Sequence, residues 1–357
     1  LEDCGFASAW LSVDALRKRK LPLIQGHSDD IRIPVVTMAP EGRARAVIPI
    51  GATRLRFEFW VDPESDHQEK LSSEVGYEAI ERGYGLTADD VEVYRTVVYP
   101  FKSKLAETWR EGRVFIAGDA AHQMTPFLGQ GACSGLRDAI NIAWKLDLVL
   151  RGVSDEGLLD TYEQERKPHV TGHVIGSSEL GRVSLELDPE IAAARDAVLL
   201  RGEGPPPPPD PVLTAGVLHR DSDGEIKLPV GDLGPQGVVT FGGQTGRFDD
   251  LLGWGFQVIG RDYDPKEDLS DGQRRFLESV RGVAIGVSGD DDAAGTGMAV
   301  DSGGAYGNYF DQHGYAAIIL RPDFTLFGGA TTREELPGLI DELQEQLIAG
   351  DRSLAGA

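Results

Sequence analysis

The feature that most constrains the fold of this chain is the segment at residues 114–146, VFIAGDAAHQMTPFLGQGACSGLRDAINIAWKL. It predicts a short apolar strand, a glycine-rich loop and then a long helix. A strand that ends at Gly118-Asp119 places a carboxylate at the carboxyl end of a sheet, where α/β folds bind ligands. Gly129 and Gly131 allow positive φ angles and close backbone approach just before the helix.

Asp119 and the start of this helix favour different parts of a ligand. The free N–H groups at a helix N-terminus stabilise a ligand edge that is or becomes negative. Asp119 repels phosphate and is suited to accept hydrogen bonds from sugar or ribityl hydroxyls. Together they suit a flavin, whereas for an isolated GxG motif a turn that only caps the helix is the alternative.

The pattern continues well beyond GxG. It comprises Gly118-Asp119-Ala120-Ala121-His122, Pro126, Gly129-Gln130-Gly131, Gly135, Asp138-Ala139 and the run from Asn141 to Leu146. This segment resembles the second FAD-binding motif of single-component FAD-dependent aromatic hydroxylases, of the phenol hydroxylase and 3-(3-hydroxyphenyl)propionate hydroxylase type. Residues 162–169, YEQERKPH, resemble the YxxERxPH helix of the same family.

The resemblance implies roles for individual residues. Gly118 and Asp119 would hold the ribityl chain, and Pro126 would lie beside the isoalloxazine ring and the substrate, near the carbon that forms the hydroperoxide. The backbone of Gly129, Gln130, Gly131 and Ala132 would face the pyrimidine edge. Cys133 would continue this cofactor site, although many relatives have Asn there, and we interpret its side chain as packing rather than as a redox thiol. No catalytic residue is assigned.

The resemblance also implies an activity. The parent protein would be a flavin-dependent aromatic monooxygenase that hydroxylates a phenol with FAD, NADH or NADPH, and O2, through a flavin hydroperoxide. A substrate like 3-(3-hydroxyphenyl)propionate is one candidate, and a polyketide-tailoring aromatic hydroxylase is an alternative. A catalytically silent fragment that serves only assembly or dimerisation is a hypothesis from another class.

Two motifs that such hydroxylases need are missing from the sequence. No GxGxxG follows a strand in residues 1–117, and Asp-Gly does not follow an apolar strand as in the middle motif of the family. GxGxxG binds the FAD pyrophosphate. We therefore expect the chain to be the C-terminal two-thirds of a flavoprotein, with FAD binding by this chain alone in doubt.

The expected fold class is mixed α+β and α/β. Residues 1–100 would form an antiparallel substrate-binding sheet, because 43–50 and 53–61 alternate apolar and polar residues. Residues 101–185 would be the C-terminal part of a glutathione-reductase-like FAD domain, 186–215 a Pro-rich linker, and 216–357 a thioredoxin-like domain without redox cysteines, implied by resemblance. Ser134, Arg137, Asp138, Asn141 and Lys145 predict one polar stripe on an otherwise buried helix.

Four arginines of the expected sheet are candidates for the substrate. Arg43 and Arg45 would share one face, as would Arg54 and Arg56. We assign Arg54 and Arg56 as the pair that could hold a substrate carboxylate; an ordinary solvated face is the alternative. Arg321-Pro322-Asp323 predicts only a strand end and a turn.

The composition limits the possible partners. A net charge of −23 argues against nucleic acid and against an anionic membrane. Cys4 and Cys133 are the only cysteines and form no CxxC, which argues against a metal ribbon or disulfide scaffold and suits the cytoplasm. The expected partners are a small aromatic substrate and a second copy of the chain in a homodimer.

Overall fold

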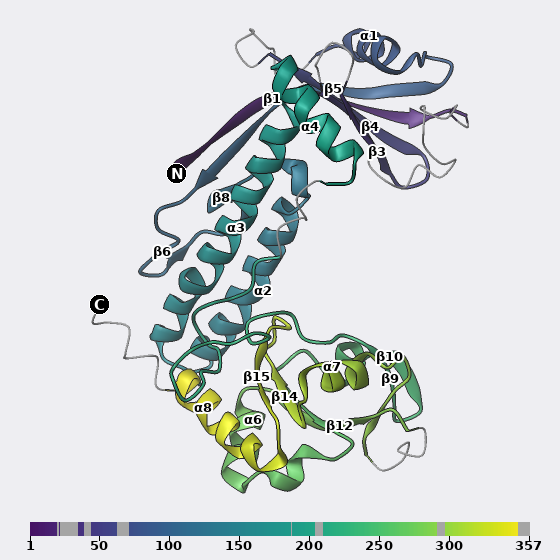
Figure 1. The fold of residues 1–357 in the computed structure, drawn as a ribbon. Helices are drawn as coiled ribbons and strands as arrows, with labels where there is room; N and C mark the ends of the chain where they lie inside the picture. The colour runs from purple at the N-terminus through teal and green to yellow at the C-terminus, as the bar shows by residue number, and fades with distance from the viewer. Residues whose placement is uncertain are drawn as a thin grey trace. The chain divides into compact units, whose positions relative to one another are not determined.

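The computed structural model describes residues 1–19, 21, 35–38, 44–62, 71–186, 188–203, 210–290 and 297–348, with only the backbone at 35–38. The chain forms two compact units (Figure 1). The first comprises Leu1–Glu107, Asp119–Gly131 and His173–Pro209, and the second comprises Thr108–Gly118, Ala132–Gly172 and Asp210–Ala357. The long helices α2 (Gly131–Leu150) and α3 (Thr161–Ser184) each belong partly to both units.

The first unit is built on an antiparallel sheet with the strand order β2-β3-β4-β1-β5-β8. Its strands are β1 (Glu2–Arg17), β2 (Val35–Met38), β3 (Ala44–Ile50), β4 (Arg54–Val61), β5 (Val91–Leu105) and β8 (His122–Gln123). The expected antiparallel sheet is therefore confirmed. The short helix α4 (Pro189–Leu200) also belongs to this unit.

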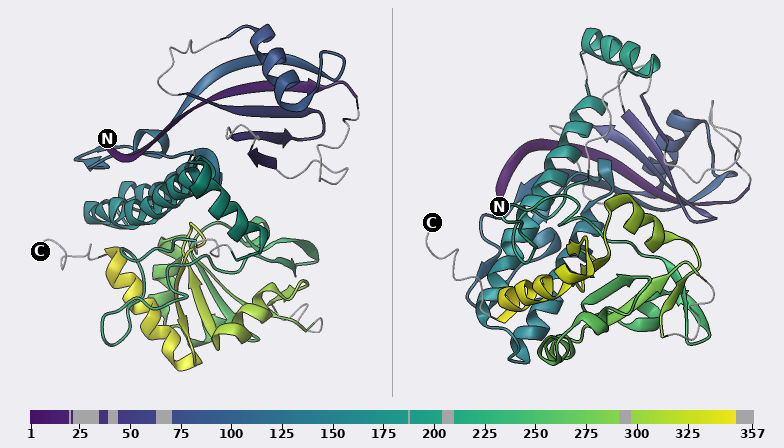
Figure 2. Two further views of the ribbon diagram at one scale, coloured as in Figure 1. Left: turned by 45° about the horizontal axis from the view of Figure 1, so that its top comes forward. Right: turned by 60° about the horizontal axis from the view of Figure 1, so that its bottom comes forward.

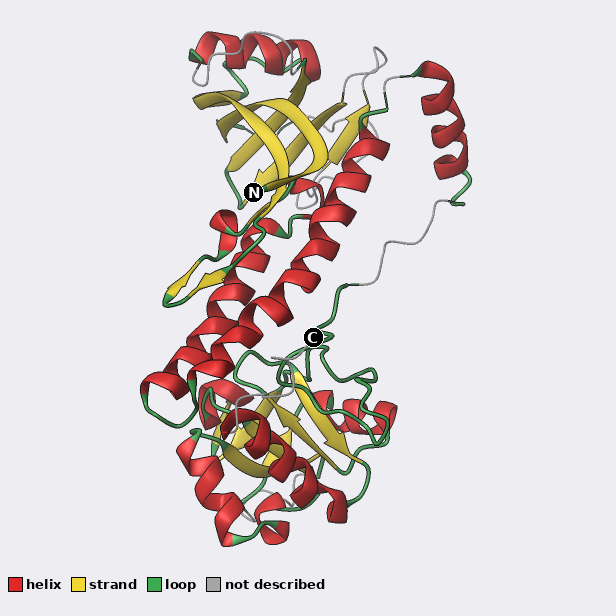
Figure 3. Cartoon of the chain, turned by 90° about the vertical axis from the view of Figure 1, so that its left-hand side faces the viewer, coloured by secondary structure: helices red, strands yellow, loops and turns green. Residues whose placement is uncertain are grey.

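Helix α1 (Ser73–Tyr84) covers one face of this sheet (Figure 3). Val13, Phe57 and Ile80 are fully buried between them. Gly76 permits the close packing, because a Cβ atom there would lie 2.5 Å from Thr96 Oγ1. The opposite face of the sheet therefore carries the alternate residues, including Ser12, Arg56 and Glu58.

The second unit contains a seven-stranded mixed sheet with the order β10-β9-β13-β12-β11-β14-β15. Its strands are β9 (Val238–Phe241), β10 (Gln244–Arg247), β11 (Gln257–Arg261), β12 (Val283–Ser288), β13 (Ala299–Asp301), β14 (Ala317–Leu320) and β15 (Leu326–Ala330). Only the β11–β12 and β12–β13 pairs are parallel. The hairpin β6 (Arg110–Glu111) and β7 (Val114–Phe115) is separate from this sheet.

Helices complete the second unit. They are α5 (Phe248–Leu252), α6 (Asp271–Ser279), α7 (Ala305–His313) and α8 (Leu336–Ile348). Helix α8 lies along the sheet (Figure 2) and buries Leu336, Ile340 and Leu343 in the core that also contains Ile319 of β14. No helix in the described ranges is long and apolar enough to cross a membrane.

The expectation for helix α2 is wrong in one respect. Its polar stripe exists, but it faces inward: Ser134, Asp138, Asn141 and Lys145 are buried. Leu136 and Ile140, on the apolar remainder of the helix, are exposed. The physical reason is that Asp138, Asn141 and Lys145 find hydrogen-bond or ion-pair partners on other segments, which offsets the cost of burying them.

Candidate functional site

The glycine-rich loop between β7 and α2 has two left-handed glycines. Gly118, at the start of the short 3-10 helix Gly118–Ala120, has φ 57°, and Gly129 has φ 65° and ends the 3-10 helix Pro126–Leu128. The N–H group of Gly129 donates to the Pro126 carbonyl at 2.9 Å. Gly131, in contrast, is simply the first residue of α2 and is not among the residues with positive φ. Only Gly129 of this pair therefore needs to be glycine for its conformation.

A buried charge network fixes the turn at Gly118 within the second unit. The N–H group of Gly118 donates to Asp138 Oδ2 at 3.0 Å, and Arg166 Nε donates to Asp138 Oδ1 at 2.9 Å. Arg166 Nη2 also approaches the Ser134 carbonyl at 3.4 Å. Asp138 and Arg166 are almost completely buried, so their charge-assisted hydrogen bonds are stronger than exposed ones would be.

Asp138 and Arg166 are positioning residues that the sequence analysis did not assign. Both occur in the stretches that resemble the hydroxylase motifs, which was the available signal. Gly135, one turn before Asp138, serves the same contact, because a Cβ atom there would lie 3.4 Å from Gly118 Cα. The turn and the helix thus approach each other at backbone distance.

The predicted cofactor-binding residues are accessible. Asp119, Pro126, Gly129, Ala132 and Cys133 are exposed, while Gly118, Gln130 and Gly131 are partly buried. Within the described part of the chain, no hydrogen bond or ion pair occupies the Asp119 carboxylate. The exposure of Cys133 makes our interpretation of its side chain as packing wrong, because the start of α2 leaves that position uncovered.

The loop is also held within the first unit. Ser177 Oγ of α3 donates to the Thr125 carbonyl at 2.6 Å, and both side chains are buried. Phe127 packs edge-on against Trp10 of β1, with ring centroids 6.0 Å apart. Gly181 of α3 leaves room for it, since a Cβ atom there would lie 2.6 Å from Phe127 Cε2. Pro126 and Phe127 are therefore anchored on the sheet face that α1 leaves free.

The predicted substrate arginines have different environments. Arg56 donates to both oxygens of Asp14, at 2.8 and 3.3 Å, and Arg95 donates to Asp14 at 3.0 Å. Burial alone would raise the pKa of Asp14, but the hydrogen bonds from Arg56 and Arg95 outweigh it and the pKa is lowered. Arg54 is exposed at the far end of β4. Arg45 lies over the Tyr84 ring on the α1 side, and Arg43 is outside the described residues.

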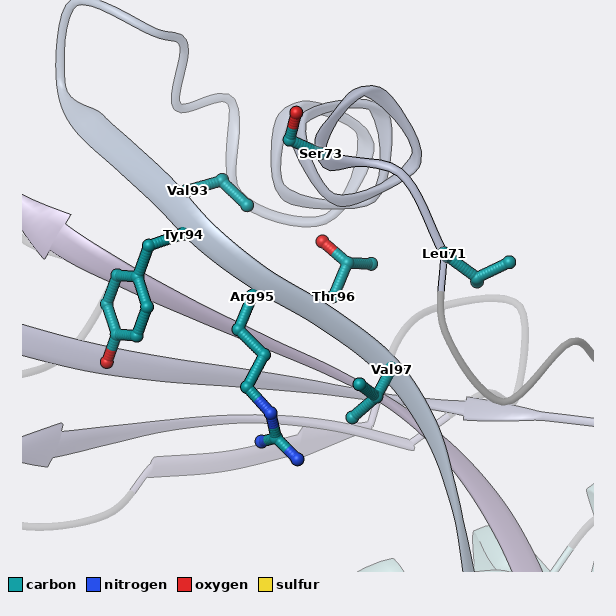
Figure 4. A pocket seen from close by; sticks show the side chains of 7 residues that line it. All are labelled: Leu71, Ser73, Val93, Tyr94, Arg95, Thr96 and Val97. Atoms are coloured by element: carbon teal, nitrogen blue, oxygen red, sulfur yellow. The ribbon is translucent and has the colours of Figure 1, made fainter.

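A separate pocket of about 800 Å³ opens at strand β5 (Figure 4). Its lining consists of Leu71, Ser73 and the β5 residues Val93, Tyr94, Arg95, Thr96 and Val97. The lining contains no residue of the glycine-rich loop, and the guanidinium group of Arg95 is already paired with Asp14. This pocket is therefore lined by none of the predicted cofactor-binding residues.

A second buried charge cluster lies in the second unit. Glu165 of α3 forms ion pairs with Lys145 Nζ at 2.8 Å and with Arg321 Nη2 at 2.7 Å, and Arg321 also pairs with Asp323 at 2.6 Å. Asn141 donates to both Glu165 and Asp323. Two cations balance two carboxylates, and burial lowers the pKa of Lys145 to about 8 despite Glu165. The expectation that 321–323 is only a turn is therefore too simple.

The described ranges contain no group of His, Cys, Asp or Glu side chains that could hold a metal ion. The geometry instead offers an exposed carboxylate, an accessible helix N-terminus and a sheet face with aromatic residues.

Comparison with known proteins gives this geometry a family context. Residues 5–177 match the FAD binding domain model, and residues 231–346 match the HcaD C-terminal domain model. The chain is 34% identical over 349 residues to a probable NADH-specific resorcinol 4-hydroxylase from Rhodococcus jostii. The matched region covers 96% of this chain and 62% of that protein. It is 34% identical over 297 residues to a 3-(3-hydroxy-phenyl)propionate/3-hydroxycinnamic acid hydroxylase from Klebsiella pneumoniae, covering 78% and 53%.

Solved structures share the fold. The flavin-dependent monooxygenase PieE, in complex with FAD and substrate, matches with a TM-score of 0.72 at 19% identity, over 95% of this chain and 66% of that one. Aklavinone-11 hydroxylase, in a ternary complex with FAD and aklavinone, matches with a TM-score of 0.65 at 21% identity, over 95% and 63%. The chain thus spans little more than half to about two-thirds of the length of these proteins.

Proposed function

Because the chain belongs to the FAD-dependent aromatic hydroxylases, we propose that it binds FAD through the loop before α2 and hydroxylates a phenolic ring. Bound FAD, reduced by NADH, would allow one atom of O2 to be transferred to the ring while the other leaves as water. The protein would bind and orient both reactants and exclude water. The observation that carries this proposal is the Gly118 turn, which Asp138 and Arg166 fix in place while Asp119 remains exposed.

The residues present fit part of the cofactor. The free Asp119 carboxylate suits ribityl hydroxyls, and the first N–H groups of α2, at Gly131 to Cys133, have no acceptor within the helix and suit the pyrimidine edge. Pro126 would lie against the ring. No GxGxxG motif is present for the pyrophosphate, so we propose that these residues supply only this part of the binding energy.

The substrate would lie against the sheet face that carries Trp10 and Trp60. Trp10 stacks on Phe101 at 5.6 Å between ring centroids, and Phe127 closes the same cluster next to Pro126. An aromatic ring gains from such neighbours through burial and through edge-to-face contacts. This placement brings the reacting ring to the residue that we assign to the flavin side.

The test is cofactor uptake followed by turnover. The purified protein is titrated with FAD and followed by visible absorbance, and then supplied with NADH, O2 and a phenol such as resorcinol. We expect a coloured protein and a hydroxylated product that forms in step with NADH consumption. A protein that takes up no FAD and leaves phenols unchanged would refute the proposal and favour a role in assembly.

We propose further that residues 216–357 form a thioredoxin-like domain after a Pro-rich linker at 186–215. The parallel β11–β12 pair, the antiparallel β14 and β15 and the final helix α8 support this assignment. Thioredoxin chemistry needs two thiols, and both cysteines of the chain lie outside this region. Its role would be packing or homodimer formation.

A further inference from the structure

The free face of the first unit's sheet contains a buried polar pair that the proposed function does not yet use. Ser12 of β1 is directly opposite Glu58 of β4 in the strand register, and the next pair on the same face of the sheet is Trp10 and Trp60. Residues paired in this way share a face of the sheet. The polar pair therefore lies one step, about 7 Å, from the aromatic cluster that holds Phe127.

Glu58 is buried but weakly bonded. Ser12 is 5% exposed and Glu58 is 9% exposed. The hydrogen bond from Ser12 Oγ to Glu58 Oε1 is long, at 3.5 Å, and is the one hydrogen bond that the described residues make to the Glu58 carboxyl group. A buried carboxyl group ordinarily has better partners. This pair therefore has hydrogen-bonding capacity left for a ligand.

The charges around the pair disfavour an anionic ligand. Arg56 is already bound to Asp14 through both carboxylate oxygens. Arg54 is six residues from Trp60 along β4, or about 20 Å, which is too far to reach a ring held at the aromatic cluster. Burial raises the pKa of Glu58 in spite of Arg56 and Ser12, while Asp14 adds to the rise. Among the residues that the structure describes, a carboxylate placed here would meet Glu58 and Asp14, and the nearby Arg56 and Arg95 are already paired with Asp14.

We propose that Ser12 and Glu58 receive an uncharged hydroxyl group of the aromatic substrate and thereby select phenols with a second ring hydroxyl over phenols with a carboxylate side chain. This inference rests on the proposed function, since it places the substrate ring on the same sheet face. A carboxyl group and a serine hydroxyl can each donate or accept a hydrogen bond, which suits a phenolic OH. Arg54 and Arg56 then have no part in substrate binding.

The test compares two probes by isothermal titration calorimetry on the FAD-loaded protein: resorcinol and 3-(3-hydroxyphenyl)propionate. We expect resorcinol to bind more tightly by about tenfold or more, because a charged group buried without a partner is disfavoured. Glu58→Gln keeps the hydrogen bonds and should retain resorcinol binding, whereas Glu58→Leu should weaken it by about tenfold. Glu92→Leu, at an exposed position of β5 in the same sheet, is the matched control and should change nothing.

Several outcomes would overturn the inference. They are tighter binding of the propionate compound, unchanged resorcinol affinity in Glu58→Leu, and equal losses in Glu58→Leu and Glu92→Leu. Circular dichroism verifies that each variant is folded. The proposed function fails differently, through absence of FAD uptake or of hydroxylated product in the unmodified protein. If the protein binds FAD and hydroxylates phenols but its affinity for resorcinol does not depend on Glu58, only the inference about the hydroxyl group is refuted.

Discussion

Asp119 is the single side chain on which the cofactor assignment depends most. Its carboxylate is exposed, and it directly follows Gly118, whose N–H group donates a hydrogen bond to the buried Asp138. Replacement by Ala should weaken FAD binding by roughly tenfold to a hundredfold, since a hydrogen bond to a charged group contributes ~1.5–3 kcal/mol. The measurement is FAD titration. Asp89→Ala, which removes an exposed carboxylate elsewhere in the first unit, should leave FAD affinity intact, and equal affinity in both variants would remove Asp119 from the site.

Glu58 should also leave a signature in the pH dependence of stability. The pKa of this carboxyl group is raised from 4.5 by burial. Because the folded state ionises less readily than the unfolded state, the wild-type protein loses stability as pH rises from about 4.5 through the folded-state pKa. Glu58→Gln does not titrate, so its melting temperature should exceed that of the wild type at neutral pH. The gain should vanish below pH 4. A constant difference at all pH values would contradict this account.

The environment of these residues could be predicted only in part. The alternation of β4 correctly placed Arg54 and Arg56 on one face, because side chains alternate along any strand. It could not show that Asp14, 42 residues earlier in the chain, neutralises Arg56. Strand pairing decides such contacts, and the sequence does not state which strands pair.

At the level of elements, α2 shows the same limit. Its polar spacing was recognisable, but a stripe of polar residues does not reveal which side of a helix faces the protein. The direction follows from Glu165, Arg166 and Asp323, which supply the partners for the buried polar groups. These partners are distant in the sequence, so the usual rule that polar faces are solvated gave the wrong orientation.

Two glycines in the loop before α2 look equivalent in the sequence but have different conformations in the structure. Gly129 has φ 65°, and a Cβ atom there would meet nothing within 4 Å, whereas a Cβ atom at Gly131 would lie 3.7 Å from Met124 Cγ in ordinary contact. Gly129→Ala should therefore cost about 1–2 kcal/mol of stability through backbone strain alone. Gly131→Ala should be neutral or stabilise by up to about 1 kcal/mol, since alanine favours helices. Urea unfolding measures both; a larger loss at Gly131 would contradict this reasoning.

For the whole molecule, the cluster around Glu165 connects segments that are far apart in the chain. Lys145 and Glu165 come from the two long helices, and Arg321 and Asp323 follow β14. All four belong to the second unit; Lys145, Glu165 and Arg321 are buried, and Asp323 is partly buried. The C-terminal sheet therefore belongs to one compact unit with residues 132–172, which comprise most of α2 and the first half of α3. This connection could not be predicted from the sequence, because a Pro-rich stretch intervenes and charge pairing at long range leaves no local pattern.

Removal of one charge should show how much this cluster contributes to the free energy of unfolding. Glu165→Gln leaves Lys145 and Arg321 buried with one carboxylate between them, and breaking such a pair costs about 3–5 kcal/mol. Glu179→Gln, which removes the exposed partner of Arg182 on the same helix, should cost at most about 1 kcal/mol. Chemical unfolding gives both values. Addition of Lys145→Met to Glu165→Gln restores the charge balance and should recover part of the loss, because the remaining Arg321 and Asp323 neutralise each other. Lys145→Met alone gives the effect of that substitution on the free energy of unfolding when Glu165 is present. If Lys145→Met has the same effect when it is added to Glu165→Gln, the two residues act independently and the cluster is not a single electrostatic unit.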